Sequence, residues 1–240
     1  MKPFVAQWRS ELQVMLRNGE QLLLTLGIPL ILLCFFSKVD VLPTGTKHPI
    51  DFLAPGILAL AVMSSAMVAL GIATGFERSY KVLKRLGATP LGRPRLVAAK
   101  TAAVVVTEVV QFAILIPVAY ALGWRPHGAN WLLAVGGVVV GTIAFAGVGL
   151  VLAGRLRAEI NLAAQNGLYL VLLLLGGMVI SFSKLPTVLR AIAHLLPSGA
   201  LADVLHHALS GQSTPGGSWI VLAVWAVVAP PLAARLFRWE

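Results

Sequence analysis

The stretch LAPGILALAVMSSAMVALGIATG, residues 53–75, decides the fold class of this chain. It runs for 23 residues without a charged side chain. An α-helix rises about 1.5 Å per residue, so about 20 apolar residues cross the hydrocarbon core of a bilayer, which is roughly 30 Å thick. The stretch therefore predicts a helix that spans a membrane.

The composition of the whole chain agrees with this prediction. Of its 240 residues, 58% are hydrophobic and 12% are charged, and the mean hydropathy is +0.86. Soluble domains average about half apolar residues and about a quarter charged ones. We therefore expect an all-α integral membrane protein. The single cysteine, Cys34, cannot form an internal disulfide, which excludes a disulfide scaffold and most cysteine metal sites.

Six segments are long and apolar enough to be membrane spans. They are 21–37, 53–75, 101–122, 131–153, 162–182 and 219–237. The connections between them are short, except for a basic segment at 76–100 and a longer connection at 183–217. This pattern predicts one transmembrane domain over residues 1–240.

The distribution of cations predicts how the spans are oriented. With the N-terminus inside, 14 of the 19 Lys and Arg residues lie on the cytoplasmic side. The five on the outer side are Lys38, Lys47, Arg125, Lys184 and Arg190. Basic loops stay in the cytoplasm, so we expect both termini there, in a multi-pass protein of the plasma membrane. No small-residue cleavage site follows the first apolar run, which favours a span over a cleaved signal peptide.

Residues 3–19 are predicted to form an amphipathic helix at the inner membrane surface. Apolar residues three or four positions apart make one stripe, formed by Phe4, Trp8, Leu12, Met15 and Leu16. Lys2, Arg9 and Arg17 are then available to anionic head groups. The alternative is a plain cytoplasmic lead-in to the first span.

The outer connection at 183–217 is predicted to contain two short re-entrant helices. Apolar residues between Leu185 and Leu196 have helical spacing, and a second helical piece covers Ala200 to Leu209. Residues 197–199, Pro-Ser-Gly, are expected to break the helix between them. Both pieces are expected to dip into the outer leaflet, where backbone is tolerated only if it is helical or covered by protein.

The basic segment at 76–100 contains a short predicted helix. Val82, Leu83 and Leu86 form its apolar edge, Gly87 ends it, and Pro90 prevents it from resuming at once. A short basic helix held between two spans is a surface that a soluble partner can grip. By composition alone, a basic loop held by lipid head groups is an equal alternative.

Particular residues of this segment carry a resemblance. They are Glu77-Arg78, Tyr80, Val82-Leu83-Lys84-Arg85-Leu86, Ala88-Thr89-Pro90-Leu91 and Lys100. Together they resemble the cytoplasmic loop between the second and third spans of ABC-2-type exporter permeases, including the daunorubicin-resistance drug exporters. The N-terminal helix, the six spans and the outer connection are also similar to the family outline. The family usually has glycine where this chain has Lys81.

The resemblance implies a permease subunit that pairs with a second permease, identical or related, and with a separate ABC ATP-binding subunit. The residues that it assigns to ATPase docking are Glu77, Arg78, Val82, Leu83, Lys84, Arg85, Leu86, Thr89 and Pro90. ATP and magnesium are expected in that partner, with no cofactor in this chain and no nucleic acid as a partner. Residues 87–92 have the glycine spacing of a phosphate loop, but Arg93-Pro94 follows where Lys and Ser or Thr are needed.

The sequence carries no motif for catalysis or for a metal ion. The five histidines are expected in outer loops and are His48, His127, His194, His206 and His207. The His-Glu-x-x-His and Gly-x-Ser-x-Gly motifs are absent, and no two carboxylates share a span for acid and base work. We therefore expect a non-catalytic membrane subunit.

Glu108 is the carboxylate that falls inside a predicted span, with Gln111 three residues later on the same helix face. A charge in the middle of a membrane costs about 2.5–3.5 kcal/mol on insertion scales. Glu108 is therefore expected to face the bundle interior, in a transport path that suits a cationic substrate. The alternative is that its side chain reaches toward Lys100 or Arg93 at the inner surface.

These features predict the permease of an ATP-driven exporter that moves a small amphipathic molecule, such as a drug, an antibiotic or a lipid-like compound. Such a role would serve multidrug efflux or antibiotic resistance. The alternatives are a lipid or glycan exporter of the same family, and a secondary transporter or accessory membrane protein that does not use ATP. A proton-coupled transporter would normally need more relay groups than Glu108.

Overall fold

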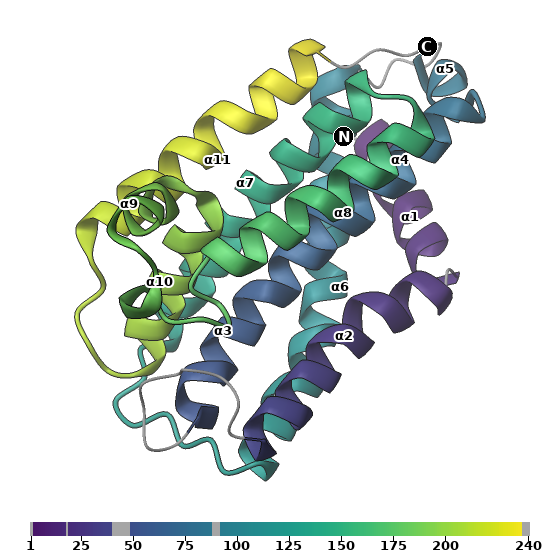
Figure 1. Ribbon diagram of the computed structural model, residues 1–240. Coiled ribbons are helices and arrows are strands. Elements are labelled where there is room, and N and C mark those ends of the chain that lie inside the picture. Colours follow the sequence, from purple (N-terminus) through teal and green to yellow (C-terminus); the bar gives the residue numbers. More distant parts are fainter. Residues whose placement is uncertain (1, 18, 40–48, 88–91, 237–240) are drawn as a thin grey trace.

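The computed structural model describes residues 2–17, 19–39, 49–87 and 92–236, which form helices and connecting turns without a strand. Figure 1 shows an elongated bundle whose long helices run side by side. The elements are α1 (Lys2–Arg17), α2 (Gly19–Lys38), α3 (Pro49–Met63), the π-helix η1 (Ser64–Ala69), α4 (Leu70–Ser79), α5 (Val82–Gly87), α6 (Arg93–Ala121), α7 (Trp131–Arg155), α8 (Ala158–Leu175), the 3-10 helix η2 (Phe182–Lys184), α9 (Thr187–Leu195), α10 (Pro197–Leu209) and α11 (Gly216–Leu236). The predicted all-α membrane fold is confirmed.

Five helices in the described part of the chain are long and apolar enough to cross a membrane. One of them runs through α3, η1 and α4, and the others are α6, α7, α8 and α11. The first predicted span forms α2, but its apolar part, Thr25–Lys38, is shorter. The bent pair of α9 and α10 would make a sixth span if it counted as one, so the six-span arrangement stays a prediction.

The helix from Pro49 to Ser79 is the centre of the bundle. Its apolar window is 83% buried inside the subunit, and α2, α7, α8 and α10 pack around it. Close packing is possible because the neighbours meet it at small residues. A Cβ on Gly56 would lie 1.9 Å from the Met178 carbonyl oxygen, and a Cβ on Gly149 would lie 2.5 Å from the Met67 carbonyl oxygen.

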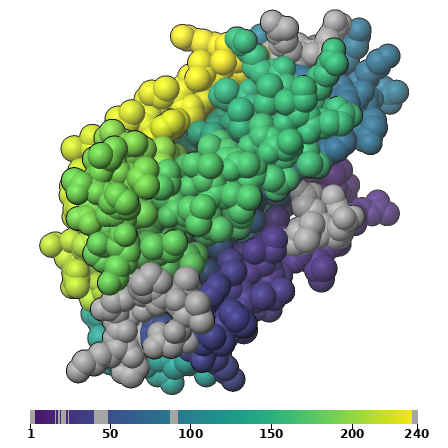
Figure 2. Space-filling view, in the orientation of Figure 1, coloured from purple at the N-terminus to yellow at the C-terminus, as the bar shows by residue number. Residues whose placement is uncertain are grey.

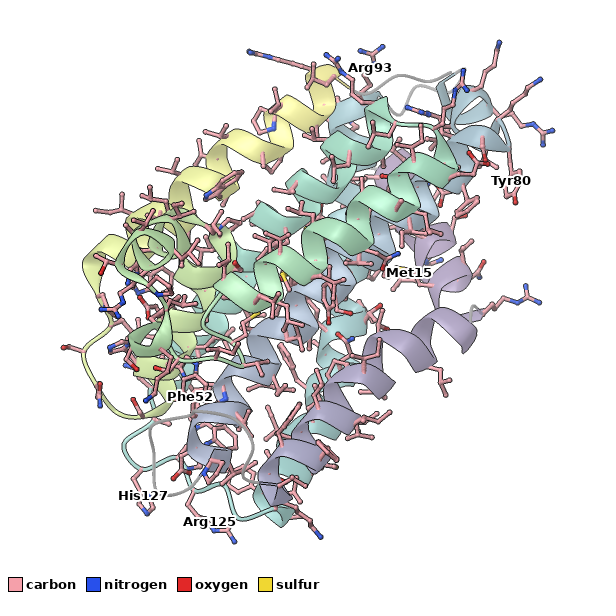
Figure 3. All side chains as sticks on the ribbon, in the orientation of Figure 1. Met15, Phe52, Tyr80, Arg93, Arg125 and His127 are labelled. Carbon is pink, nitrogen blue, oxygen red and sulfur yellow. The ribbon has the colours of Figure 1, made fainter. Side chains whose placement is uncertain are left out.

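The two ends of the bundle differ in charge. Figure 3 shows Tyr80 and Arg93 at one end and Arg125 and His127 at the other. The end with α5 also carries the last turn of α7 and the last turn of α11, and we call it the basic end. Helix α1 packs against α6 on the side of this end. The separation of cations along the chain is therefore also a separation in space.

Helix α8 ends earlier than predicted. The span was expected to reach residue 182, but the helix stops at Leu175. Gly177 has a φ of 66°, a left-handed conformation that glycine adopts without a steric penalty. A Cβ on Gly176 would lie 2.8 Å from the Cβ of Ser198, because α10 packs against this turn. The end of α8 at Leu175 therefore leaves space for α10 to pack against this turn.

The outer connection contains the two predicted helices, α9 and α10, which meet at an angle of 86°. The predicted break at 197–199 was wrong. The helix breaks at Leu196, and Pro197 occupies the first turn of α10, where the fixed φ of proline suits a helix start. Most of α10 is buried against α3 and α7, while Val188 and Leu195 of α9 are exposed. How deep either helix enters a membrane stays a prediction.

Candidate functional site

Helix α5, the predicted docking helix, lies at the basic end between α4 and α6. Leu83 is fully buried and forms a small apolar cluster with Leu96 and Leu86, separate from the main core. Leu96 belongs to the first turn of α6. Burial of the Leu83 side chain against Leu96 contributes about 1.5–3 kcal/mol to holding α5 at the start of α6.

This packing corrects the docking prediction for Leu83. We expected Val82, Leu83 and Leu86 to form one apolar edge for a partner, but the Leu83 side chain is already covered by its own subunit. The exposed apolar side chains near α5 are instead Tyr80, which is 72% exposed, and Val82, which is 40% exposed. Figure 3 shows Tyr80 directed away from the bundle.

The charged residues of the predicted docking site divide into two groups. Lys84 and Arg85 on α5 are exposed. Arg78 turns inward, and its Nη2 donates a hydrogen bond to the carbonyl oxygen of Leu156. Glu77 also turns inward, toward α6. Thr89 and Pro90 lie outside the described residues.

Glu77 belongs to a buried ion cluster that the sequence did not predict. The Nζ atom of Lys100 lies 2.7 Å from Oε2 of Glu77 and 2.9 Å from Oε2 of Glu11, and the Lys100 side chain is 1% exposed. Gln7 donates a hydrogen bond of 2.6 Å to the other oxygen of Glu11. We call Lys100, Glu11 and Glu77 the ion triad.

The ion triad joins three elements at the basic end. Glu11 comes from α1, Glu77 from the last turns of α4 beside α5, and Lys100 from α6. The Lys100 and Glu11 side chains are almost fully buried, and the Glu77 side chain is 20% exposed. Separating Lys100 from its two carboxylates would therefore leave a buried cation without a partner, which has a large electrostatic cost. A displacement of α5 and the end of α4 would therefore be passed to α1 and α6.

Lys81, between α4 and α5, has a φ of 60°. A non-glycine residue in this left-handed region costs about 1–2 kcal/mol, because its Cβ approaches the following carbonyl oxygen. Glycine avoids this cost, which accounts for the glycine that the resembling family usually has here. Only Tyr80 and Lys81 separate α4 from α5, so the chain must change direction between the two helices within two residues.

Glu108 lies inside the bundle, as predicted, and its side chain contacts two other elements. Oε2 accepts a hydrogen bond of 2.7 Å from Thr142 of α7, and Oε1 lies 3.3 Å from the Ser65 hydroxyl of η1. The residue is 2% exposed. The alternative that Glu108 reaches toward Lys100 or Arg93 is wrong, because its carboxyl oxygens contact Thr142 and Ser65, and Lys100 pairs with Glu11 and Glu77.

The hydroxyl groups of Thr142 and Ser65 cannot donate a hydrogen bond to every oxygen that they contact, because each hydroxyl has one proton. Thr142 Oγ1 is also 2.8 Å from the carbonyl oxygen of Val138, and a hydroxyl donates only one proton. The geometry suits a neutral carboxyl that donates to Thr142, or a carboxylate that receives a cation from outside the chain. Within the described residues, no Lys, Arg or His pairs with Glu108.

Glu108 also lines a groove of about 190 Å³ between α6 and α7. The rest of the lining is apolar and includes Val105, Val109, Phe112, Trp131 and Val135. Several of these side chains are exposed on the outside of the subunit, so the groove is open to lipid or to a second subunit.

Gln111 does not join this groove. Its Nε2 donates a hydrogen bond of 2.9 Å to the carbonyl oxygen of Thr25 in α2. Glu108 and Gln111 are both buried, but their polar groups bind different helices. The structure therefore separates the two residues that we expected to act together.

Sequence reasoning missed a pair of amides on α8. Asn161 donates a hydrogen bond of 2.9 Å to the carbonyl oxygen of Gly71, and Gln165 donates one of 2.9 Å to that of Gly149. A Cβ on Gly71 would lie 2.0 Å from the Gln165 amide nitrogen. Asn161 and Gln165 are four residues apart, as are Gly71 and Gly75, so each pair lies on one helix face. This matching spacing was the sequence signal that could have predicted contact between the two faces.

Two of the histidines lie in a different environment from the one expected. His206 and His207 belong to α10 and not to a solvated loop. The His206 ring stacks on Phe52 at 4.5 Å between ring centroids, and its Nε2 is 3.3 Å from the carbonyl oxygen of Gly177. In the described ranges, no three His, Cys, Asp or Glu residues lie close enough to hold a metal ion.

Comparison with known proteins agrees with this arrangement. The chain belongs to the ABC-2 type transporter family, whose model matches residues 3–209. It is also similar to a Bacillus subtilis (strain 168) protein described as "Putative transport permease YvfS", with 24% identity over 95% of this chain and 94% of that protein. The protein is thus a transporter permease of the multi-pass membrane class. Permeases of this family generally partner with ATP-binding subunits and are typically non-catalytic.

Proposed function

We propose that this chain is the membrane subunit of an ATP-driven exporter of small amphipathic molecules in the plasma membrane. Two permeases, identical or related, would assemble with two ABC ATP-binding subunits, which supply ATP and magnesium. The basic end would face the cytoplasm, where both termini would lie. Family membership and the cation distribution support this proposal.

The observation that carries the proposal is the way α5 is mounted. The helix presents exposed Val82, Lys84 and Arg85, and exposed Tyr80 lies just before it, yet Leu83 of the same helix packs on Leu96 of α6. A helix that only bound lipid would not need a rigid connection to the spans. An ATPase that pulls on α5 would move α4 and α6 together, and the ion triad would carry the movement to α1.

Docking is tested with the exposed residues of the segment. The double variant Tyr80→Ala, Val82→Asp is expected to weaken association with a co-expressed ABC ATP-binding subunit about 30-fold, because a hot-spot anchor contributes about 2 kcal/mol or more. Co-purification and cargo-stimulated ATP hydrolysis measure the effect.

The matched control is Val188→Asp on α9 at the other end of the bundle, where Val188 is 72% exposed, as much as Tyr80 and more than Val82. This variant is expected to keep the ATPase. Full association and ATP-dependent transport by the Tyr80, Val82 variant would contradict docking at α5. Transport that continues in vesicles without ATP would instead identify a secondary transporter.

Glu108 is proposed to hold the positive group of a cationic cargo in the groove between α6 and α7. The variant Glu108→Gln keeps the shape and the hydrogen bonds but removes the charge. Export of a fluorescent cationic amphiphile from cells is expected to fall roughly tenfold, because a hydrogen bond to a charged group is worth about 1.5–3 kcal/mol. Export of a neutral compound of similar size should change little.

The control for this experiment is Glu159→Gln, which removes an exposed carboxylate from the start of α8. It is expected to leave both cargoes unaffected. Unchanged export of the cationic compound by Glu108→Gln would mean that Glu108 serves only to pack the bundle.

A further inference from the structure

Two hydroxyl groups contact the Glu108 carboxyl, and each of them also contacts a backbone carbonyl oxygen. Thr142 Oγ1 lies 2.7 Å from Oε2 of Glu108 and 2.8 Å from the carbonyl oxygen of Val138. Ser65 Oγ lies 3.3 Å from Oε1 of Glu108 and 2.9 Å from the carbonyl oxygen of Ala61. A carbonyl oxygen only accepts hydrogen bonds, so the direction of each hydroxyl proton depends on the state of the carboxyl.

A neutral Glu108 satisfies both short contacts of Thr142, and a carboxylate does not. If Thr142 donates its one proton to Val138, it can accept the O–H of a neutral Glu108, and each contact then contains a hydrogen. If Thr142 donates to a carboxylate instead, two oxygen atoms lie 2.8 Å apart with no hydrogen between them, which is repulsive. Without a bound cation, the hydrogen bonding therefore favours the neutral carboxyl.

The ionisable side chains on α6 itself, on the elements packed against it and on α10 do not contact Glu108 in the described ranges. Glu11 and Glu77 pair with Lys100 of α6. The others lie near helix ends, are exposed or contact other groups, and they are Arg9, Arg17, Cys34, Lys38, Asp51, Arg93, Arg95, Tyr120, Arg155, Asp203, His206, His207 and Arg235. A carboxylate at Glu108 would thus be an unpaired charge inside the bundle, which is costly.

The Glu108 carboxyl is reached through the groove of about 190 Å³ between α6 and α7. Helices α8, α9 and α10 cover much of the face shown in Figure 2, and α6 is among the more distant helices in Figure 1. Among the described residues, the other side chains that line the groove are apolar and include the rings of Phe112 and Trp131. A metal cation needs several oxygen ligands, whereas an organic ammonium can pair with one carboxylate and pack its carbon groups on apolar and aromatic surface. The groove therefore suits an organic ammonium.

We propose that a proton and the ammonium group of an organic cation compete for the Glu108 carboxyl. Without cargo, Glu108 is neutral and donates to Thr142. When the cation enters the groove, the O–H bond of Glu108 breaks, its electron pair stays on Oε2, and the proton passes to water in the surrounding solution. The carboxylate then pairs with the ammonium. This inference rests on the proposed cargo site at Glu108 and adds that each bound cation displaces one proton, while ATP would still supply the energy for export.

Binding of a fluorescent quaternary ammonium compound tests the exchange, because the charge of this probe does not change with pH. The full permease is used, purified in a neutral detergent without an ATPase. Between about pH 5.5 and pH 7, the association constant is expected to rise about tenfold per pH unit, since acid favours the neutral carboxyl and each cation displaces one proton. An indicator dye in a weakly buffered solution should report about one proton released for each probe molecule bound.

Two variants connect this pH dependence to the site. Glu108→Gln keeps the shape of the side chain but cannot exchange a proton, so its probe binding is expected to be weak and equal at every pH. Glu159→Gln, which removes an exposed carboxylate from α8, is the matched control and should keep the full pH dependence. Binding that Glu108→Gln weakens but that does not vary with pH in the parent would overturn the exchange and leave the cargo site in place. Equal binding by the parent and Glu108→Gln at the alkaline end of the range would overturn both.

The variant Thr142→Val shifts probe binding in a direction that depends on the state of Glu108. Valine has a similar shape but cannot accept a hydrogen bond from the neutral carboxyl, so the site holds its proton less firmly. The probe is therefore expected to bind about fivefold more tightly than in the parent at about pH 5.5. If Thr142 donated to a carboxylate, the same variant would instead remove a contact that stabilises the charge. Unchanged or weaker binding at this pH would overturn the proposal.

Discussion

Replacement of Lys100 by methionine is expected to destabilise the protein by about 3–5 kcal/mol, the usual cost of removing one partner from a buried ion pair. Methionine has a similar volume, so the change leaves no large cavity. It removes the cation that both Glu11, which is 7% exposed, and Glu77, which is 20% exposed, contact. The midpoint temperature of thermal unfolding of the purified permease should fall by about 10 °C.

The triple variant Lys100→Met, Glu11→Gln, Glu77→Gln is the matched rescue. It removes all three charges, and neutral replacements of buried ion groups are often tolerated. We expect it to regain most of the lost stability but not the transport activity, if the ion triad carries movement from α5 to α1. A loss of 1 kcal/mol or less in Lys100→Met alone would mean that water reaches the triad and screens it.

Replacement of Gly149 by valine is expected to cost about 3 kcal/mol, at the upper end of the cost of overpacking. The added Cβ would lie 2.5 Å from the carbonyl oxygen of Met67 and 3.0 Å from its Cα. These are backbone atoms of η1, so α7 must move away from the central helix. That movement would also stretch the hydrogen bond from Gln165 to the Gly149 carbonyl oxygen.

The control is Gly167→Ala on α8, where an added Cβ meets nothing within 4 Å. It is expected to stabilise the protein by up to about 1 kcal/mol, because alanine favours the helix over glycine. Both variants are compared by thermal unfolding in detergent. A Gly149→Val protein as stable as the parent would show that α7 and η1 are not in close backbone contact.

The predicted spans match helices because each depends on local sequence. The run 53–75 lies within the helix from Pro49 to Ser79, and 131–153 lies within α7. An apolar run of that length forms a helix in a membrane whatever its neighbours are, since its backbone groups must bond within the segment. The ends were less predictable, as α8 shows, because they depend on contacts with α10.

The interior position of Glu108 was also predictable, while its partners were not. The cost of a charge in lipid directs the residue inward without specifying a neighbour. Thr142 and Ser65 contact it because α7 and η1 cross α6 at that level. For the same reason, the separate direction of Gln111 toward α2 could not be seen from the spacing of the two residues.

The sequence by itself determined that this protein is a bundle of membrane helices with a short basic helix at one end, because hydrophobic length and charge are properties of the chain. Tertiary structure alone decided that Leu83 is buried, since an apolar edge looks the same whether it meets a partner or its own subunit. It also decided the ion triad, in which Glu11 and Lys100 are 89 residues apart. Burial of a charge needs a counter-charge within a few ångströms, and only the packing of α1 on α6 supplies one.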